Sequence, residues 1–448
     1  MSVRSVSTLV VLLQFLSVSH AATLLEAIHL AEVKDPNFAA LRTIRSIADK
    51  TPEIARAALL PHIVLTASSG SAKLTQDPIR FAPNLPAVGG DTEYDSTEWG
   101  GRLIQPLFDW TAFQQYQSAK LQRSREQARA DSKAQLLYLN TASTYFDVLR
   151  AQDGLSIAKS RLKTLDKRLE EAQEKFNVGL VSKVDVLEQE SQRDAAASQL
   201  LSAEDQLNVQ MENLTAIVGE RLPKLAGLRD NLPVLAPTPN NIDAWGKLAV
   251  KQNPDVLASQ FDIQQSEANH TAAQGGYLPQ INFFASYTDR NLKGSNNAAV
   301  ALNSGTTEVI GVEALWEIFS GGVTNARVKQ TSLQTALARQ NHEVDSKQIE
   351  NQSRAIFMSV KTDASRIKAQ QRSVASATLS YSAIEAGYAA GTHSIVDLMA
   401  SETKLNTARV ELTNARYDYI INCLRLYKII GMLNESAITR INGWLAES

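Results

Sequence analysis

One short stretch of the sequence contains the residue types of a hydrolytic triad. His393, Ser394 and Asp397 supply the imidazole, hydroxyl and carboxylate that serine hydrolases use for nucleophilic catalysis. All three lie within about one helical turn, and neighbours at the start of one helix do not normally assemble in the triad geometry. The stretch therefore favours a structural role, and we expect that the protein is not an enzyme.

The other chemistry-bearing residues form no catalytic or ligand-binding motif. The six histidines are scattered, with no pair at i, i+4 and no HExxH sequence, so no set of metal ligands is apparent. The sequence also lacks a Walker loop, a GxGxxG motif and a GxSxG motif. We therefore expect neither a metal nor an organic cofactor.

The stretch around His393 has a counterpart in the first half of the chain. Residues 176–186 and 388–398 both contain an aromatic residue, then Gly, then Ser-x-x-Asp, between two long segments with heptad patterning. Glycine readily adopts the left-handed conformation that ends a helix, and Ser-x-x-Asp can cap the next helix. Each stretch is predicted to be the tip of a helical hairpin.

These tips belong to a longer internal repeat. Asp35-Pro36 matches Asn253-Pro254 at a shift of about 218 residues, and Gly179 matches Gly391 at a shift of about 212. The predicted order is a signal peptide at 1–21, a first repeat at 22–222, a connector at 223–240, a second repeat at 241–433 and a C-terminal tail at 434–448. The first repeat is predicted to contain helices 23–60, strands near 61–70 and 97–108, and long helices 110–176 and 182–218. The second is predicted to contain helices 242–277, strands near 279–289 and 307–319, and long helices 322–388 and 394–430.

Composition and the N-terminus restrict the location and the partners. The 45 basic and 47 acidic residues nearly balance, which argues against a nucleic-acid partner. Arg4, a short apolar run and Ala21-Ala22 indicate a secretory signal that is cleaved after about Ala21. Cys423 is the only cysteine, so no intrachain disulfide is possible. We expect an exported protein.

Two strand-like segments in the second repeat alternate between apolar and polar residues. The apolar faces are Ile281, Phe283, Ala285 and Tyr287 in one segment, and Ile310, Val312, Ala314 and Trp316 in the other. This alternation suits the wall of a membrane β-barrel, although a half-buried sheet in a soluble protein fits each strand equally well. In the first repeat, about 26 residues between the strands are rich in Pro, Gly and Asp and are predicted to form a long loop.

The long segments are predicted to be paired helices. From 110 to 176 there is no proline, so this segment can form a helix of roughly 100 Å. Apolar residues recur every seven positions, with Leu155, Leu162, Leu169 and Phe176 in the first repeat and Leu398, Leu405, Leu412, Tyr419 and Leu426 in the second. Most of the charges off this seam, as in 167–171, are predicted to lie on a solvated helix face.

Four strands are too few to close a barrel, because about eight is the usual minimum. Strand edges cannot remain unpaired in lipid. If the strands are membranous, the chain must therefore form oligomers in which each copy adds its strands and a long helical projection.

This arrangement resembles the TolC family of outer-membrane factors, the exit ducts of tripartite efflux pumps and type I secretion systems. The most specific matches are 176–181, 387–397 and 411–419, and the likeness covers nearly the whole mature chain. The resemblance implies a mainly α fold with a membrane β-barrel portion: a homotrimer with a 12-stranded barrel, four strands from each protomer, continued by a periplasmic α-helical barrel. It also implies a gated channel in the outer membrane of a Gram-negative bacterium that contacts outer-membrane lipid, an adaptor protein and an inner-membrane transporter.

The resemblance also assigns roles to residues at the tips. The matched gate positions are Asp397 in an acidic ring, Tyr388 and Asp185 as a gate tyrosine and its carboxylate partner, and Val184 beside that partner. His393 stands where the best-known members have arginine, and Ala400 stands where a second ring aspartate is usual. The matched adaptor contacts are Val178, Gly179 and Leu180 at one tip and Ala390, Gly391 and Thr392 at the other, with Ala390 in place of the usual valine.

Several alternatives remain open from the sequence. Asp185 and Asp397 also fit simple helix caps, and Tyr388 also fits a packing role. We hypothesise that His393 makes a gate bond titratable, since histidine changes its charge between pH 5 and 8. A non-channel periplasmic coiled-coil scaffold or adhesin is the competing function, and the substrate of a channel remains open between drugs, metals and secreted proteins.

Overall fold

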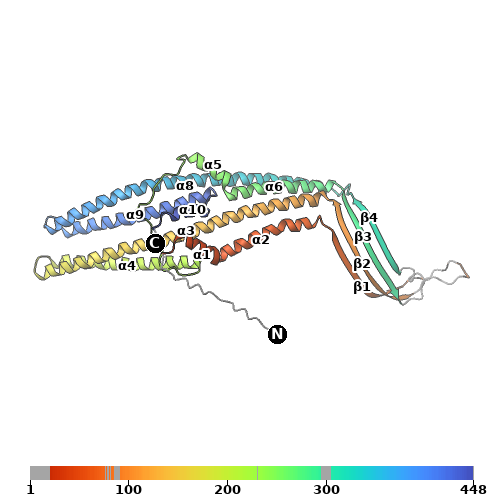
Figure 1. Ribbon diagram of the computed structural model, residues 1–448, viewed down its shortest axis with the longest axis horizontal. Helices are drawn as coiled ribbons and strands as arrows, with labels where there is room; N and C mark the ends of the chain where they lie inside the picture. Colours follow the sequence, from red (N-terminus) through yellow and green to blue (C-terminus); the bar gives the residue numbers. More distant parts are fainter. Residues whose placement is uncertain are drawn as a thin grey trace, which may run out of the picture. The chain divides into compact units, whose positions relative to one another are not determined.

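The computed structural model describes residues 21–75, 77, 80, 82–84, 91–229, 231–293 and 304–446. The predicted signal peptide at 1–21 lies almost entirely outside these residues, as do most prolines and glycines of the predicted long loop. Helices form most of the described chain, and the described strands form one four-stranded sheet (Figure 1).

The chain divides into two compact units that each contain parts of both sequence repeats. The first, which we call the tip unit, combines residues up to Arg42 with Asp131–Pro254 and Lys347–Ser448. The second, the sheet unit, combines Thr43–Ala130 with Asp255–Ser346.

A proline separates two short helices in each repeat. The pairs are α1 (Leu24–Lys34) with α2 (Pro36–Ala57), and α5 (Ile242–Gln252) with α6 (Pro254–Gln274). Asp35 and Asn253 precede these prolines and have extended backbones, because the proline ring disfavours helical geometry in the residue before it. The helix predicted to continue to 277 ends at Gln274 and is followed by the 3₁₀ turn η1 (Gly275–Tyr277).

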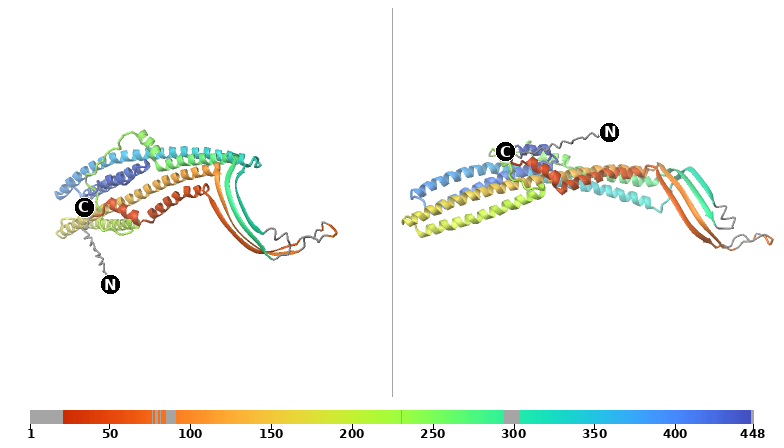
Figure 2. Two further views of the ribbon diagram at one scale, coloured as in Figure 1. Left: turned by 45° about the vertical axis from the view of Figure 1, so that its right-hand side comes forward. Right: turned by 60° about the horizontal axis from the view of Figure 1, so that its bottom comes forward.

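Four long helices form two hairpins. They are α3 (Trp110–Asn177), α4 (Lys183–Val218), α8 (Val323–Ala389) and α9 (Ile395–Ile429), each with bounds at most one residue from those expected. Within the tip unit, α4 runs beside the end of α3, and α9 runs beside the end of α8 (Figures 1 and 2).

The heptad seam is buried to different extents in the two hairpins. In α9, Leu398, Leu405 and Leu426 are buried, and Leu405 clusters with Ala377 and Ala408. In α3, the seam residues with little exposure are the intervening Leu165 and Ala172. Leu155, Leu162 and Leu169 are only half-buried and Phe176 is exposed, so this line of the predicted seam is not covered within one chain.

The predicted tail at 434–448 contains a helix that we did not expect, α10 (Glu435–Asn442). Asn434 caps it by accepting a hydrogen bond from the backbone N–H of Ala437 at 3.1 Å. Ile438 and Ile441 are fully buried, and the backbone N–H of Leu25 donates to the side chain of Asn442. The short apolar spacing after Asn434 is the sequence signal for this helix.

The sheet has the antiparallel order β1 (His62–Leu74), β2 (Thr92–Phe108), β3 (Gln280–Lys293), β4 (Gly305–Leu315). β1 and β2 extend farther than expected into the predicted long loop. β4 is predicted to continue to 319 but ends at Leu315, because Leu315 pairs with Gln280, the first residue of β3, and no described strand provides a partner for the residues after Leu315.

The register aligns the apolar positions of all four strands on one face. Ile63, Leu103, Ala285 and Ile310 form one cross-strand row, and Phe283 pairs with Val312 in another. Ile63 is 65% exposed and Ile310 is 75% exposed, so the described residues leave this face largely uncovered. The opposite face carries mainly polar residues such as Thr66, Ser286 and Thr307.

The outer edges of the sheet are also uncovered. Among the described residues, β1 pairs only with β2 and β4 only with β3. Within the same part of the chain, no helix has both the length and the apolar character to cross a membrane.

Candidate functional site at the helical hairpin tips

The two hairpin tips have nearly identical backbones. Gly179 and Gly391 have φ angles of 76° and 78°, the left-handed conformation that glycine adopts without steric cost. At the first tip, the N–H of Leu180 donates to the carbonyl of Lys175 at 2.9 Å, and at the second the N–H of Thr392 donates to Gly387 at 2.8 Å. These bonds satisfy the last carbonyls of α3 and α8 and explain why both helices stop there.

Both Ser-x-x-Asp sequences form complete capping boxes. The hydroxyl of Ser394 accepts from the N–H of Asp397 at 3.1 Å, while the Asp397 carboxylate accepts from the N–H and the hydroxyl of Ser394 at 3.0 and 2.7 Å. Ser182 and Asp185 repeat the same bonds at the start of α4. Both aspartates therefore act as helix caps in this structure.

The neighbourhood of Asp397 explains its charge state. The hydrogen bonds from Ser394, and to a smaller extent the charge of His393, hold the pKa of Asp397 below its usual range. The Nδ1 atom of His393 lies 3.9 Å from Oδ2 of Asp397, and both side chains are about half exposed. A protonated His393 is therefore close enough to offset part of the Asp397 charge.

The imidazole of His393 packs against the last turn of α8. A Cβ atom at Gly387 would collide with Cδ2 of His393, so the absence of a side chain at Gly387 makes room for the ring. The Ser394 hydroxyl bonds to Asp397 and not to His393, which is not the arrangement that a nucleophilic serine requires.

Tyr388 lies on the side of the second tip that faces Lys175 of the first hairpin. Its ring is covered by the ammonium of Lys175, which lies 5.5 Å from the ring centroid. Burial and then the charge of Asp185 raise the pKa of the Tyr388 phenol. Among the described residues, no hydrogen bond joins the Tyr388 hydroxyl to Asp185, so this structure brings the proposed gate pair near each other without bonding them.

The outermost tip residues are exposed. Val178 is 71% exposed, Leu180 74% and Val184 72%. At the other tip Ala390, Gly391 and Thr392 are also exposed. The described chain leaves an apolar tip surface uncovered, which is unusual for residues of this type.

A buried ion pair between the two hairpins was missed by the sequence analysis. The side chains of Arg168 in α3 and Glu402 in α9 are 11% and 8% exposed, and Nη1 of Arg168 donates to Oε2 of Glu402. Arg168 also donates to the hydroxyl of Tyr381 and lies 3.4 Å from Glu385. Burial raises the pKa of Glu402 above its usual range, although Arg168 acts in the opposite direction.

This pair is an exception to the expectation that most of the charges off the seam, as in 167–171, lie on a solvated face. Lys167, Glu170 and Glu171 are exposed, but Arg168 points into the contact between the hairpins. Its two carboxylate partners lie more than 200 residues away in the chain, so no local pattern in the sequence predicts the pair.

No described group of three or more His, Cys, Asp and Glu side chains is arranged to hold a metal ion. The tips contain carboxylates at two helix starts, an imidazole next to one of them and a buried ion pair between the hairpins.

Comparison with known proteins gives consistent matches over almost the whole chain. The family model described as outer membrane efflux protein matches residues 27–220 and 245–432, which correspond in position to the two sequence repeats. The outer membrane protein TolC of Escherichia coli is 29% identical over 442 residues, with 97% of this chain and 87% of that protein covered. The alkaline protease secretion protein AprF of Pseudomonas aeruginosa is also 29% identical, with 93% and 86% covered.

The fold is also similar to those of solved structures. The CmeC outer membrane channel of Campylobacter jejuni has a TM-score of 0.77 and 18% sequence identity, and the match covers 94% of this chain and 90% of that chain.

Proposed function

Because this chain belongs to the outer membrane efflux protein family, we propose that it is an outer-membrane channel that conducts substrates from an inner-membrane transporter to the cell exterior. The main observation behind this proposal is that, among the described residues, the sheet has an exposed apolar face and two edges without a partner strand. An apolar face of this kind is stable in contact with lipid, whereas its exposure to water costs free energy.

The uncovered edges of β1 and β4 favour a closed ring of several copies. An unpaired strand edge leaves backbone N–H and C=O groups without partners, which is costly in lipid. Three copies of this sheet supply twelve strands, enough to close a barrel that four strands cannot close. The assembly is a homotrimer in which β1 of one protomer pairs with β4 of the next.

The hairpins form the periplasmic extension of this channel and its gate. Around a threefold axis, three copies of Asp397 concentrate negative potential, which favours cations over anions in a narrow pore. The lowered pKa of Asp397 supports this role, because the carboxylate stays ionised at neutral pH. Tyr388, Asp185, Val184 and His393 line the same constriction.

The exposed tip residues are the docking surface for a periplasmic adaptor protein, which links the channel to the transporter. Val178, Gly179 and Leu180 at one tip and Ala390, Gly391 and Thr392 at the other make this contact. The high exposure of Val178 and Leu180 supports a partner at this place.

The names of the family and of one relative indicate the class of substrate that the channel transports. The family description refers to efflux, and the name of AprF refers to secretion of a protease. We therefore propose either small-molecule efflux or type I protein secretion, with the choice made by the inner-membrane transporter.

A planar lipid bilayer tests the channel directly. The purified full-length protein is added to one side, and we expect stepwise increases in current, each from one inserted assembly. A protein that produces no current, and that remains monomeric in detergent, would support a periplasmic scaffold or adhesin.

A further inference from the structure

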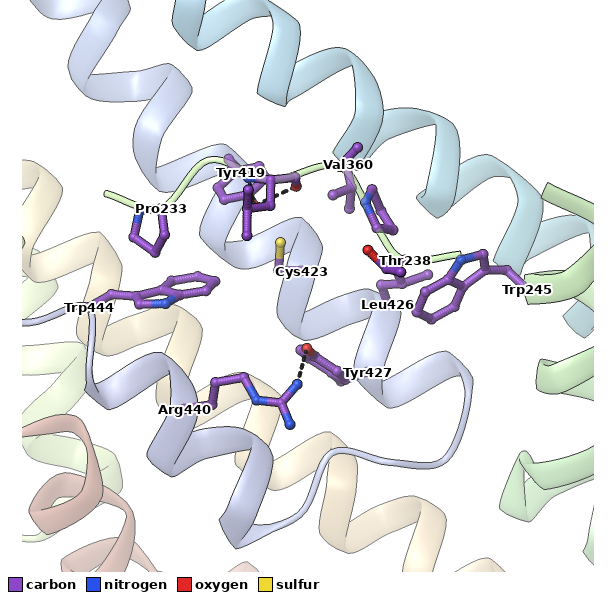
Figure 3. A pocket seen from close by; sticks show the side chains of 13 residues that line it. Pro233, Thr238, Trp245, Val360, Tyr419, Cys423, Leu426, Tyr427, Arg440 and Trp444 are labelled. Atoms are coloured by element: carbon purple, nitrogen blue, oxygen red, sulfur yellow. Dashed lines mark hydrogen bonds between the residues drawn. The ribbon is translucent and has the colours of Figure 1, made fainter. Parts of the chain in front are cut away.

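A cavity in the tip unit lies apart from the hairpin tips and has no part in the proposed channel. Its volume is about 320 Å³, and it lies between α9, α10, the start of α5 and the connector that follows α4 (Figure 3). The lining is mostly aromatic and aliphatic and includes Tyr419, Tyr427, Trp245, Trp444 and Leu426. Small-molecule sites in proteins have volumes of roughly 300 to 1,000 Å³, so this cavity suits a ligand of one or two rings.

The walls of the cavity are held in place by hydrogen bonds and ring contacts. The Tyr419 hydroxyl accepts from the N–H of Leu235 at 3.1 Å and donates to its carbonyl at 2.9 Å, which fixes the connector to α9. The ring of Tyr419 stacks on Trp444 with centroids 6.2 Å apart, and the indole N–H of Trp245 donates to the carbonyl of Pro239 at 2.8 Å. The aromatic surfaces are therefore preorganised, which lowers the entropic cost of binding a ring.

One positive charge lies at the edge of this apolar cavity. Arg440 donates to the hydroxyl of Tyr427 at 3.0 Å, and its guanidinium lies 5.8 Å from the centroid of the same ring. Within the described part of the chain, Arg440 has no ion pair with a carboxylate. Among the described side chains, the hydrogen-bond partner of Arg440 is the neutral phenol of Tyr427, so the guanidinium keeps further N–H donors for an anion.

The charge and the rings together define the ligand. In Figure 3, Cys423 lies between Tyr419 and Tyr427, and Arg440 and Trp444 lie at the lower left of the cavity. A guanidinium binds a carboxylate with two parallel hydrogen bonds, and aromatic walls bind a planar ring. We propose that this cavity is a binding site for a planar aromatic carboxylate, with the ring between the aromatic walls and the carboxylate on Arg440.

The probe for this site is 2-naphthoate, and 2-naphthamide is its neutral counterpart. Isothermal titration calorimetry of the full-length protein in detergent should give saturable binding at one site per chain, with the amide at least about tenfold weaker. Arg440→Gln should weaken naphthoate binding by a similar factor, whereas Arg440→Lys should retain part of it. Arg425→Gln, which removes an exposed α9 charge outside the cavity, should leave binding unchanged.

The only cysteine of the chain reports where the probe binds. Cys423 lines the cavity and is 9% exposed, and burial raises the pKa of its thiol to about 12, so N-ethylmaleimide should label it slowly. Saturating naphthoate should slow this labelling several-fold by intact-mass measurement. Unsaturable binding, equal binding by Arg440→Gln, equal binding of the amide, or unchanged labelling at saturation would each overturn the proposal.

Discussion

At the scale of single residues, the least expected feature is the buried pair of Arg168 and Glu402. Each side chain loses most of its contact with water, and each keeps the other as a charged partner. Burial raises the pKa of Tyr381 to about 12, so its phenol remains protonated and donates to Glu385 at 2.7 Å. These four residues join α3 to both helices of the second hairpin just above the tips.

We predict that Glu402→Gln loosens this contact. Removing one partner of a buried ion pair costs about 3 to 5 kcal/mol, and Glu385, which is half exposed at 3.4 Å, can replace part of the lost interaction. The expected loss is therefore at the lower end, so amide hydrogen exchange in residues 381–389 should rise by about 100-fold.

Glu170→Gln is the control, since it removes the same charge from an exposed position on α3, the helix that contains Arg168. Arg168→Leu combined with Glu402→Leu should exchange more slowly than Glu402→Gln, because no unpaired charge remains buried. If Glu402→Gln and Glu170→Gln exchange at the same rate, the pair contributes nothing to the contact.

A second prediction concerns His393 and the pH dependence of ion selectivity. The pKa of Asp397 is lowered and that of Tyr388 is raised, so between pH 5 and 8 the former stays charged and the latter stays neutral. Histidine side chains in general change their charge in this range, and the imidazole of His393 lies 3.9 Å from the Asp397 carboxylate. The wild-type channel should therefore become more cation-selective from pH 5 to pH 8.

His393→Arg keeps its positive charge throughout and should remove most of this change, as measured by the reversal potential in a salt gradient. Other titrating groups are the same in both proteins and cancel in the comparison. An equal pH response in the two channels would show that His393 does not set the tip charge.

At the scale of elements, the turns and long helices could be predicted because their signals are local. Glycine followed by Ser-x-x-Asp defines each tip, and the heptad pattern gives each long helix. The end of β4 at Leu315 could not be predicted, because it depends on where its partner β3 begins. The burial of Arg168 could not be predicted for the same reason, because a distant helix that buries a side chain leaves no pattern in the residues around it.

Variants at the start of α9 distinguish the two roles of Asp397, which are capping the helix and giving the tip a negative charge. Ser394→Ala removes the side-chain cap and should weaken the start of α9 by about 1 kcal/mol, which is measurable as faster hydrogen exchange in residues 395–398. The carboxylate remains, so ion selectivity should not change. Asp397→Asn keeps the Ser394 cap but loses the charge, so cation selectivity should fall.

The stability that the Asp397 carboxylate gives to the start of α9 depends on pH. Because the pKa of Asp397 is lowered in the folded protein, its carboxylate stabilises the helix start fully above the ordinary aspartate pKa of about 3.9. The contribution is lost as the pH falls through the lowered value. If neither variant alters selectivity, Asp397 is only a cap.

At the scale of the whole molecule, one chain leaves several apolar surfaces and strand edges uncovered, and further copies of the chain would cover them. Among the described residues, nothing fully covers the edges of β1 and β4, the apolar face of the sheet, or the half-buried and exposed seam residues of α3. The sequence predicts that the chain forms oligomers, because two strands per repeat cannot close a barrel. It could not give the register between copies, which no pattern within one chain encodes.

The most direct test is to join β1 of one copy to β4 of the next. Thr66 and Thr307 lie in one cross-strand row, and both are exposed. Thr66→Cys and Thr307→Cys are combined in a Cys423→Ser background and treated in membranes with a short bismaleimide. A trimeric channel should give a ladder that stops at three linked chains, and each single variant should give at most two. A ladder that stays at one or two chains, or extends beyond three, would contradict the trimeric channel.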